Sequence, residues 1–161
     1  MASNYIFYRV EDDDSQARTV RGKGVLARDK RTSIDFNARR PQECWELRRY
    51  IMNHLDWAHR QHLPFISVYD DENTAVREAE RRVEQRKRNV TITVIDVKKA
   101  WRKVEYRSVR KLACWLEFWI PKQAWHNSKH EYLFFCHIPA RAVVFHDGYE
   151  KFKRGLLISR G

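Results

Sequence analysis

The chain has 161 residues, 43% of them apolar and 13% aromatic, and its 32 Lys and Arg against 21 Asp and Glu give a formal net charge of +11. This length and apolar content exclude a disordered chain and predict one domain over residues 1–161, burying roughly 70% of its unfolded surface. With three cysteines, no signal-peptide pattern and no run of about 18 uncharged apolar residues, we expect an intracellular protein, in the cytoplasm or nucleus, with no membrane partner.

Basic residues are distributed along the chain instead of being gathered in one block. They dominate four stretches: 18–31, 77–88, 98–111 and 151–160. In the second stretch they alternate with Glu78, Glu80 and Glu84, which predicts a helix face exposed to solvent. The positive charge is compatible with solubility alone, or with an anionic partner that is either nucleic acid or an acidic protein.

The first 62 residues predict a strand, a long loop and a helix. Residues 5–10 are a β-type run that an acidic turn ends, and residues 15–40 form a long basic loop with a short strand at 33–36. Residues 41–62 predict a helix that starts at a proline and ends before Pro64. Its apolar stripe has helical spacing: Cys44, Leu47, Ile51, Leu55 and Ala58.

The rest of the chain mixes short helices and strands. We expect strands at 65–69, 91–97, 131–138, 142–146 and 156–159, helices at 73–87, 98–103 and 109–118, and a loop after Pro121. Ala75, Ala79 and Val83 are the expected inward positions of the second helix, and the six tryptophans are expected mainly in the core. Because the elements lack regular βαβ alternation, the pattern favours an α+β fold.

Three polar residues occur in strands whose other residues are apolar: Arg9, Ser67 and Glu131. Burying such groups costs several kcal/mol unless each finds a partner. Convergence of the three in one cleft would provide partners. Because strand side chains alternate between faces, Ser67 is expected on the same face as Phe65 and Tyr69.

These residues resemble a known arrangement. An arginine in the first strand, a serine in a mid-chain strand and a glutamate in a late strand are similar to the Arg–Ser–Glu set of the ADP-ribosyltransferase fold, which has mixed or antiparallel sheets flanked by helices. From Tyr5 to about Phe145 the chain resembles more closely a fungal domain family of uncharacterised function. The motifs that carry this resemblance are Tyr8-Arg9, Pro64-Phe65-Ile66-Ser67-Val68, Val94-Ile95-Asp96, Glu131-Tyr132-Leu133 and Ile138-Pro139.

The resemblance implies an enzyme that cleaves the nicotinamide–ribose bond of NAD and transfers ADP-ribose to an acceptor or to water, without a metal. Glu131 would stabilise the positive charge that develops on the ribose, and Arg9 would bind the pyrophosphate through paired, charge-assisted hydrogen bonds. Ser67 would orient Glu131 or bind the ribose. Tyr69 would stack on the nicotinamide, and Tyr8 belongs to the same implied NAD-binding set.

Two positions depart from the family pattern. Arginine-modifying members carry Glu-x-Glu, whereas Lys129 stands two residues before Glu131, and Ser-Thr-Ser is replaced by Ser67-Val68-Tyr69. The acid that activates an acceptor arginine is therefore missing, which leaves another acceptor, hydrolysis of NAD, or no catalysis. The alternative function is a non-catalytic basic module of the same fold that binds nucleic acid.

Structural interpretations compete with each functional one. Arg9 can pair with the acidic turn at Asp12 or Asp13. A zinc site among His126, His130, Cys136 and His137 is disfavoured, because no Cys-x-x-Cys pair accompanies them and a loop is expected around His126. The histidines of the first long helix are expected on its polar side: His54, His59 and His62.

Overall fold

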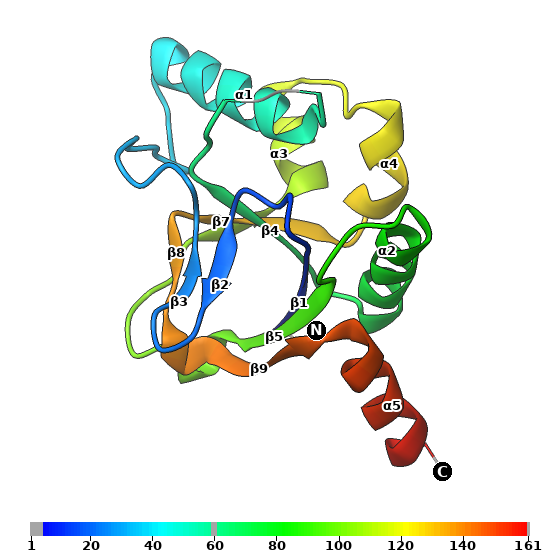
Figure 1. Cartoon of the computed structure of the whole chain (residues 1–161). Coiled ribbons are helices and arrows are strands. Elements are labelled where there is room, and N and C mark those ends of the chain that lie inside the picture. The colour runs from blue at the N-terminus through cyan, green and yellow to red at the C-terminus, as the bar shows by residue number, and fades with distance from the viewer. Residues whose placement is uncertain (1–4, 59–60, 161) are drawn as a thin grey trace.

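The computed structural model describes residues 5–58 and 61–160, whose strands form two antiparallel sheets (Figure 1). In the larger sheet the strand order is β6-β7-β4-β1-β5-β9, and in the smaller sheet it is β2-β3-β8. The larger sheet contains β1 (Ile6–Glu11), β4 (Phe65–Tyr69), β5 (Thr91–Asp96), β6 (Tyr106–Ser108), β7 (Glu131–Phe135) and β9 (Val143–Gly148). The smaller sheet contains β2 (Arg18–Val20), β3 (Gly24–Leu26) and β8 (His137–Ile138).

Helices accompany both sheets in the described part of the chain. The α-helices are α1 (Pro41–Leu55), α2 (Glu72–Glu84), α3 (Val109–Leu116), α4 (Lys122–Ser128) and α5 (Tyr149–Ser159). Two 3-10 helices are η1 (Val97–Lys99) and η2 (Ala140–Ala142). The fold is therefore α+β, with antiparallel sheets and flanking helices, as the mixed pattern of elements predicted. No described helix is long and apolar enough to cross a bilayer.

The larger sheet is covered on both faces. One face packs against the smaller sheet, where Phe7 and Phe134 of the larger sheet join Val25 and Ile138 in one buried cluster. Phe7 and Phe134 meet edge to face, with ring centroids 5.2 Å apart. Burial of these large apolar side chains fixes the smaller sheet against the larger one.

The other face carries two separate groups of helices. Helices α1 and α3 cover β4 and β7 around Leu47, Leu112 and Leu133. Helices α2 and α5 cover β1 and β5 around a second cluster that includes Ala75 and Phe152. Each group of helices therefore has its own apolar cluster on this face of the sheet.

Helix α1 ends at Leu55, earlier than predicted. Leu47, Ile51 and Leu55 are buried as the stripe predicted, whereas Ala58 lies beyond the helix and is exposed. The side chain of Asp56 accepts a hydrogen bond from the Ala58 backbone N–H at 3.0 Å, and such a local bond competes with helical pairing.

The predicted long loop at 15–40 contains strands β2 and β3, and the strand expected at 33–36 is not formed. Gly22 and Gly24 have φ angles of +79° and +97°, which allow the tight turn between the two strands. Phe36 is 2% exposed and stacks on Phe65 with ring centroids 6.0 Å apart, so it enters the core from irregular backbone.

Helix α2 lies close to its predicted position. The Asp71 side chain caps it by accepting from the Thr74 backbone N–H at 2.9 Å. Ala75 and Ala79 are fully buried as expected, whereas Val83 is 44% exposed. The prediction of a solvent-exposed acidic face was wrong for Glu78, which is only 3% exposed because it is held by arginines.

Three predictions in the second half of the chain were wrong. The helix expected at 98–103 is not formed, because only Lys98 and Lys99 are helical, as the end of η1. Helix α4 replaces the loop expected after Pro121. Residues 156–159 belong to α5, not to a strand, because Tyr149, Phe152 and Leu156 pack on one cluster at helical spacing. The run 131–138 is divided between the two sheets at Cys136, whose φ angle is +66°.

The tryptophans are on the surface, contrary to the expected core placement. Their exposed fractions run from 45% for Trp115 to 93% for Trp119, and all six have large exposed areas. On α3 the buried stripe consists of Val109, Leu112 and Leu116, so Trp115 falls outside it. Aliphatic residues and phenylalanines fill the core, whereas Trp45, Trp115 and Trp125 lie on exposed faces of helices and the other three tryptophans lie in connecting segments.

Candidate functional site

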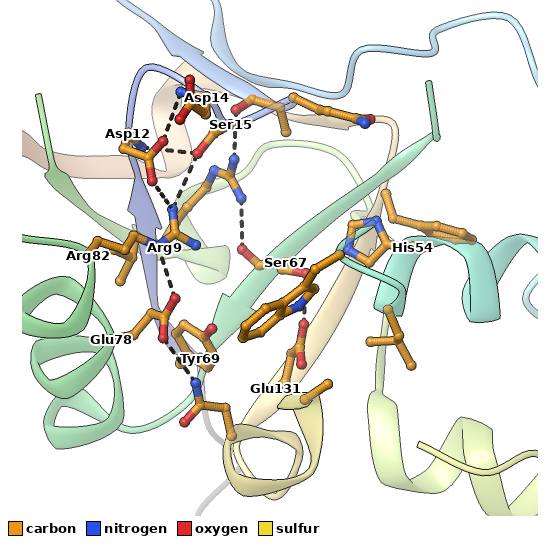
Figure 2. Close-up of a pocket in the computed structure, with 18 of the residues that line it drawn as sticks. Arg9, Asp12, Asp14, Ser15, His54, Ser67, Tyr69, Glu78, Arg82 and Glu131 are labelled. Atoms are coloured by element: carbon orange, nitrogen blue, oxygen red, sulfur yellow. Dashed lines mark hydrogen bonds and ion pairs between the residues drawn. The ribbon is translucent and has the colours of Figure 1, made fainter. Parts of the chain in front are cut away.

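A pocket of about 410 Å³ lies between the two groups of helices. Its lining comes from the C-terminal end of α1, from α2 and α4, and from strands β1, β4 and β7. Arg9, Ser67 and Glu131 all line this pocket, as Figure 2 shows. The structure thus brings together three residues that are 58 and 64 positions apart along the chain. The volume falls in the range of small-molecule sites, roughly 300–1,000 Å³.

The pocket exists because β1 and β4 diverge. The two strands pair at only one position, Tyr8 with Tyr69, whereas β1 pairs with β5 along its whole length. Ser67 lies two residues from that position and is not paired with a residue of β1 in the sheet. Arg9 fills the gap, and its Nη1 donates to the Ser67 carbonyl at 2.9 Å. A side chain thus replaces part of the sheet's hydrogen bonding.

Arg9 has partners on its own strand, in the loop before β2 and on β4. Its Nε donates to Glu11 Oε1 at 3.1 Å and its Nη2 to the Ala17 carbonyl at 2.7 Å, in addition to the Ser67 contact. Burial lowers the pKa of the guanidinium, and the negative charge of Glu11 opposes that shift. The expected pairing with Asp12 or Asp13 was wrong, because Glu11 points to the same side of β1 as Arg9, two residues away.

Glu131 starts β7 and is 7% exposed. Its Oε1 accepts a hydrogen bond from Ser67 Oγ at 2.8 Å, across the paired strands β4 and β7. Burial raises the pKa of Glu131 to about 7, although the Ser67 hydrogen bond works in the opposite direction. A carboxyl that titrates near neutral pH in a pocket is typical of functional sites.

His54 completes this chain of hydrogen bonds, so the prediction that it lies on the polar side of the helix was wrong. Of the other two histidines expected on that side, His59 lies outside the described residues and His62 lies beyond the end of α1. The Nε2 of His54 lies 2.7 Å from Ser67 Oγ. Burial lowers the pKa of His54 to about 4, so the ring is neutral at pH 7. Since the Ser67 hydroxyl donates to Glu131, His54 must donate from Nε2. The sequence did contain a signal for the inward position of His54. This residue lies seven positions after Leu47 and three after Ile51, so it shares their face of the helix.

Only one of the two tyrosines of the implied NAD-binding set lines the pocket. Tyr69 lines the pocket and is 7% exposed, and its pKa is raised by burial and by the negative charges of Glu131 and Glu78. Tyr8 is not among the residues that line the pocket, although it is the cross-strand partner of Tyr69 and packs against the same apolar cluster. Burial and the nearby Glu72 raise the pKa of Tyr8.

A second polar network forms the other side of the pocket. Glu78 Oε1 accepts from Arg81 at 2.6 Å and from Arg82 at 2.9 Å. Arg82 also donates to Asp12 Oδ2 at 3.0 Å (Figure 2). Burial opposes the charge on Glu78, but the hydrogen bonds and positive charges of both arginines outweigh it and lower the pKa. Trp57 borders this network, with the Arg81 guanidinium 4.9 Å from its ring centroid.

The late histidines have other partners. His130 Nδ1 lies 2.8 Å from Asp70 Oδ1, and His126 lies in α4, which the loop prediction had missed. His137 contacts the Lys23 carbonyl and Arg102. No group of three His, Cys, Asp or Glu residues that could hold a metal ion occurs in the described ranges.

Comparison with known proteins assigns the chain to a family. No curated protein and no solved structure shows significant similarity to it. A protein-family model described as a domain of unknown function, DUF7587, matches residues 2–152. This match spans most of the chain and contains both strands and helices that build the pocket. The chain therefore belongs to the DUF7587 family of domains of unknown function.

Proposed function

We propose that the pocket binds NAD and cleaves its nicotinamide–ribose bond, and that the domain is ADP-ribosyltransferase-like. The observation that carries this proposal is a buried carboxyl, Glu131, held by Ser67 in the same pocket as the Arg9 guanidinium. A carboxylate that accepts hydrogen bonds from ribose hydroxyls stabilises an oxocarbenium-like transition state. A guanidinium binds a pyrophosphate through charge-assisted hydrogen bonds.

In the proposed reaction the bond between ribose C1′ and the nicotinamide nitrogen breaks. The electron pair of that bond goes to the nitrogen, so nicotinamide leaves as a neutral molecule. A lone pair of the acceptor oxygen then forms the new bond to C1′, and the acceptor's proton is released to solvent. Glu131 acts in its ionised form, which opposes the positive charge on the sugar ring.

The hydrogen-bonded chain from His54 through Ser67 to Glu131 keeps the carboxylate oriented. Its two links measure 2.7 Å and 2.8 Å, and neutral His54 donates without adding positive charge beside the sugar. We assign His54 and Ser67 as positioning residues. Three of the five Arg9 N–H groups are engaged by the protein, and no described residue accepts from the other two.

Arginine is not the proposed acceptor. Lys129 occupies the position of the activating glutamate and does not line the pocket. Glu78, a second acid in the pocket, is neutralised by Arg81 and Arg82 and so does not substitute for it. We therefore propose transfer to water or to an acceptor other than arginine.

The test is nicotinamide release from NAD, compared between the wild type, Glu131→Gln and the matched control Glu84→Gln. Glu84 is an exposed carboxylate on α2 outside the pocket. We expect Glu131→Gln to reduce the rate at least about 100-fold, because removal of one electrostatic stabiliser of a transition state typically costs that much. Glu84→Gln should retain the wild-type rate, and calorimetry should show NAD binding to both variants.

The outcomes separate the parts of the proposal. Equal nicotinamide release by the wild type and Glu131→Gln would exclude Glu131 as the catalytic residue. NAD binding without release would reject catalysis while keeping the binding site. An absence of both would reject the NAD proposal.

A further inference from the structure

A second surface lies away from the pocket, and two adjacent hollows form it. Each has a volume of about 420 Å³, and both are bordered by Trp101 and Arg102. Neither hollow shares a lining residue with the Arg9–Ser67–Glu131 pocket. We call this region the Trp101 surface. Besides those two residues, it includes Lys23, Lys98, Lys103, His137 and Arg141.

The Trp101 surface is positive and contains no acid. None of the described residues that line the two hollows is Asp or Glu. Five of them are Lys or Arg: Lys23, Lys98, Arg102, Lys103 and Arg141. In contrast, the main pocket mixes cations with Glu131, Glu78 and Asp12. An acid-free group of cations creates a local positive potential that attracts a polyanion.

The Trp101 ring is available for stacking. It is 76% exposed, and no cation or aromatic ring of the described residues lies over it. Three other tryptophans differ in this respect, because arginine guanidiniums lie over Trp45, Trp57 and Trp125 at 5.6, 4.9 and 4.1 Å. A free indole face among cations is the combination that binds an unpaired nucleobase and the phosphates beside it.

The segment that carries Trp101 is anchored to the core. Val97, Ala100 and Val104 pack against the cluster between the two sheets, and Asp96 caps η1 by accepting from the Lys98 backbone N–H at 3.0 Å. The apolar residues face inward at spacings of three and four. The residues between them, including Trp101, are therefore held outward.

The backbone of the β2–β3 turn is linked to this segment through His137. His137 Nε2 donates to the Lys23 carbonyl at 2.7 Å, and Arg102 Nη2 donates to His137 Nδ1. Gly24 lets the turn approach β8, since a Cβ at this position would lie 1.9 Å from the Ile138 carbonyl oxygen. The two halves of the Trp101 surface are thus positioned before a ligand binds, which reduces the entropy cost of binding.

We propose that the Trp101 surface binds single-stranded nucleic acid. The cations contact consecutive phosphates, and a base stacks on Trp101. Single strands are favoured over duplexes because the bases of a duplex have no free face for the indole. An acidic protein would pair with the cations, but its carboxylates would not stack on the exposed Trp101 ring. This inference is independent of NAD chemistry in the pocket.

Fluorescence anisotropy with labelled dT12 and rU12 tests the proposal. Trp101→Ala should weaken binding about 5-fold or more, since base–aromatic stacking is worth about 1–3 kcal/mol. The matched control is Trp119→Ala, because Trp119 is 93% exposed and lies outside both hollows. It should bind within twofold of the wild type.

A second pair of variants tests the charges. Lys103→Gln combined with Arg141→Gln should reduce the slope of log K against log salt by about 1.4. Each phosphate contact on a single strand contributes about 0.7 to this slope, and the double variant removes two contacts. The control pair is Lys111→Gln with Arg154→Gln, two exposed cations outside both hollows, and it should leave the slope unchanged.

Four results would overturn the proposal: no oligonucleotide binding at low salt, equal losses in Trp101→Ala and Trp119→Ala, duplex binding as tight as single-strand binding, or polyglutamate binding that depends equally on Trp101. The last would indicate an acidic protein partner. Glu131→Gln should bind oligonucleotides like the wild type, and Trp101→Ala should release nicotinamide like the wild type. These two controls separate a failure here from a failure of the NAD proposal.

Discussion

The pocket and the Trp101 surface use polar residues in opposite ways. In the pocket, Arg9 and Glu131 are 5% and 7% exposed, and each has hydrogen-bond partners from other elements. On the Trp101 surface, the tryptophan is 76% exposed and its neighbouring cations lie largely in solvent. Buried polar groups are costly unless they are satisfied, whereas exposed ones cost little. This difference fits the two proposals, in which the pocket positions atoms for chemistry and the Trp101 surface attracts a polyanion.

This contrast predicts that pocket residues also support the fold. Replacing Arg9 with Ala would leave Glu11 as a buried charge without its cation and would remove donors from two carbonyls. We expect a loss of about 3–5 kcal/mol in the free energy of unfolding, measured by urea denaturation. Arg154→Ala, at an exposed arginine of α5, should stay within about 0.5 kcal/mol. A loss below about 1 kcal/mol for Arg9→Ala would mean that the Arg9 network contributes little to the fold.

Titration of Glu131 gives a second prediction. Its pKa is about 7 in the folded protein and near 4.5 when unfolded, so the folded state binds the proton more tightly. Its contribution to stability is therefore present below about pH 4.5 and is lost as pH rises through about 7. Glu131→Gln removes this loss, so its stability relative to the wild type should increase by about 3 kcal/mol between pH 4 and pH 8.

Urea denaturation of both proteins at each pH measures that difference. His54, whose pKa is lowered to about 4, contributes stability that is present above about pH 6.5 and is lost at lower pH. This contribution is common to both proteins and cancels in the comparison. A difference that does not change with pH would contradict the shifted pKa of Glu131.

Gly24 tests the surface without touching the pocket. Gly24→Ala places a Cβ against the β8 backbone at a φ of +97°, and we expect a loss of about 2–3 kcal/mol together with weaker oligonucleotide binding. Gly155→Ala is the matched control, because Gly155 lies in α5 with nothing within 4 Å of an added Cβ. It should gain about 0.5–1 kcal/mol. Thermal melts of both variants check the signs, and stabilisation by Gly24→Ala would exclude the close approach.

The smallest expected effect is that of Trp101→Ala on stability. Its ring is mostly exposed, so removing it should change the free energy of unfolding by no more than about 0.5 kcal/mol. A loss of about 2 kcal/mol or more in urea denaturation would mean that Trp101 packs as a core residue. The functional contrast between the two regions would then have to be abandoned.

Local patterns predicted several elements correctly. Strand β4 was expected at 65–69 and occurs there, because β-branched and aromatic residues between turn residues define a buried strand. The buried stripe of α1 was also recognised, since helix spacing depends on neighbours within one turn. These features are encoded within a few residues.

Partners from distant parts of the chain were predicted less well. The sequence showed that Arg9 needs a partner, but the divergence of β1 from β4 decided that the partners are Glu11, Ala17 and the Ser67 carbonyl. His54 was missed because its role depends on a serine 13 residues away, on another element.

By itself, the sequence determined the α+β class, most strand and helix positions, and the three polar residues that need hydrogen-bond partners when they are buried. The tertiary structure alone decided that these residues meet in one pocket, that Tyr8 lies outside it, and that the tryptophans are at the surface. The physical reason is that periodicity shows which residues share a face of one element. Which face is covered, and by what, depends on packing between elements that are far apart in the chain.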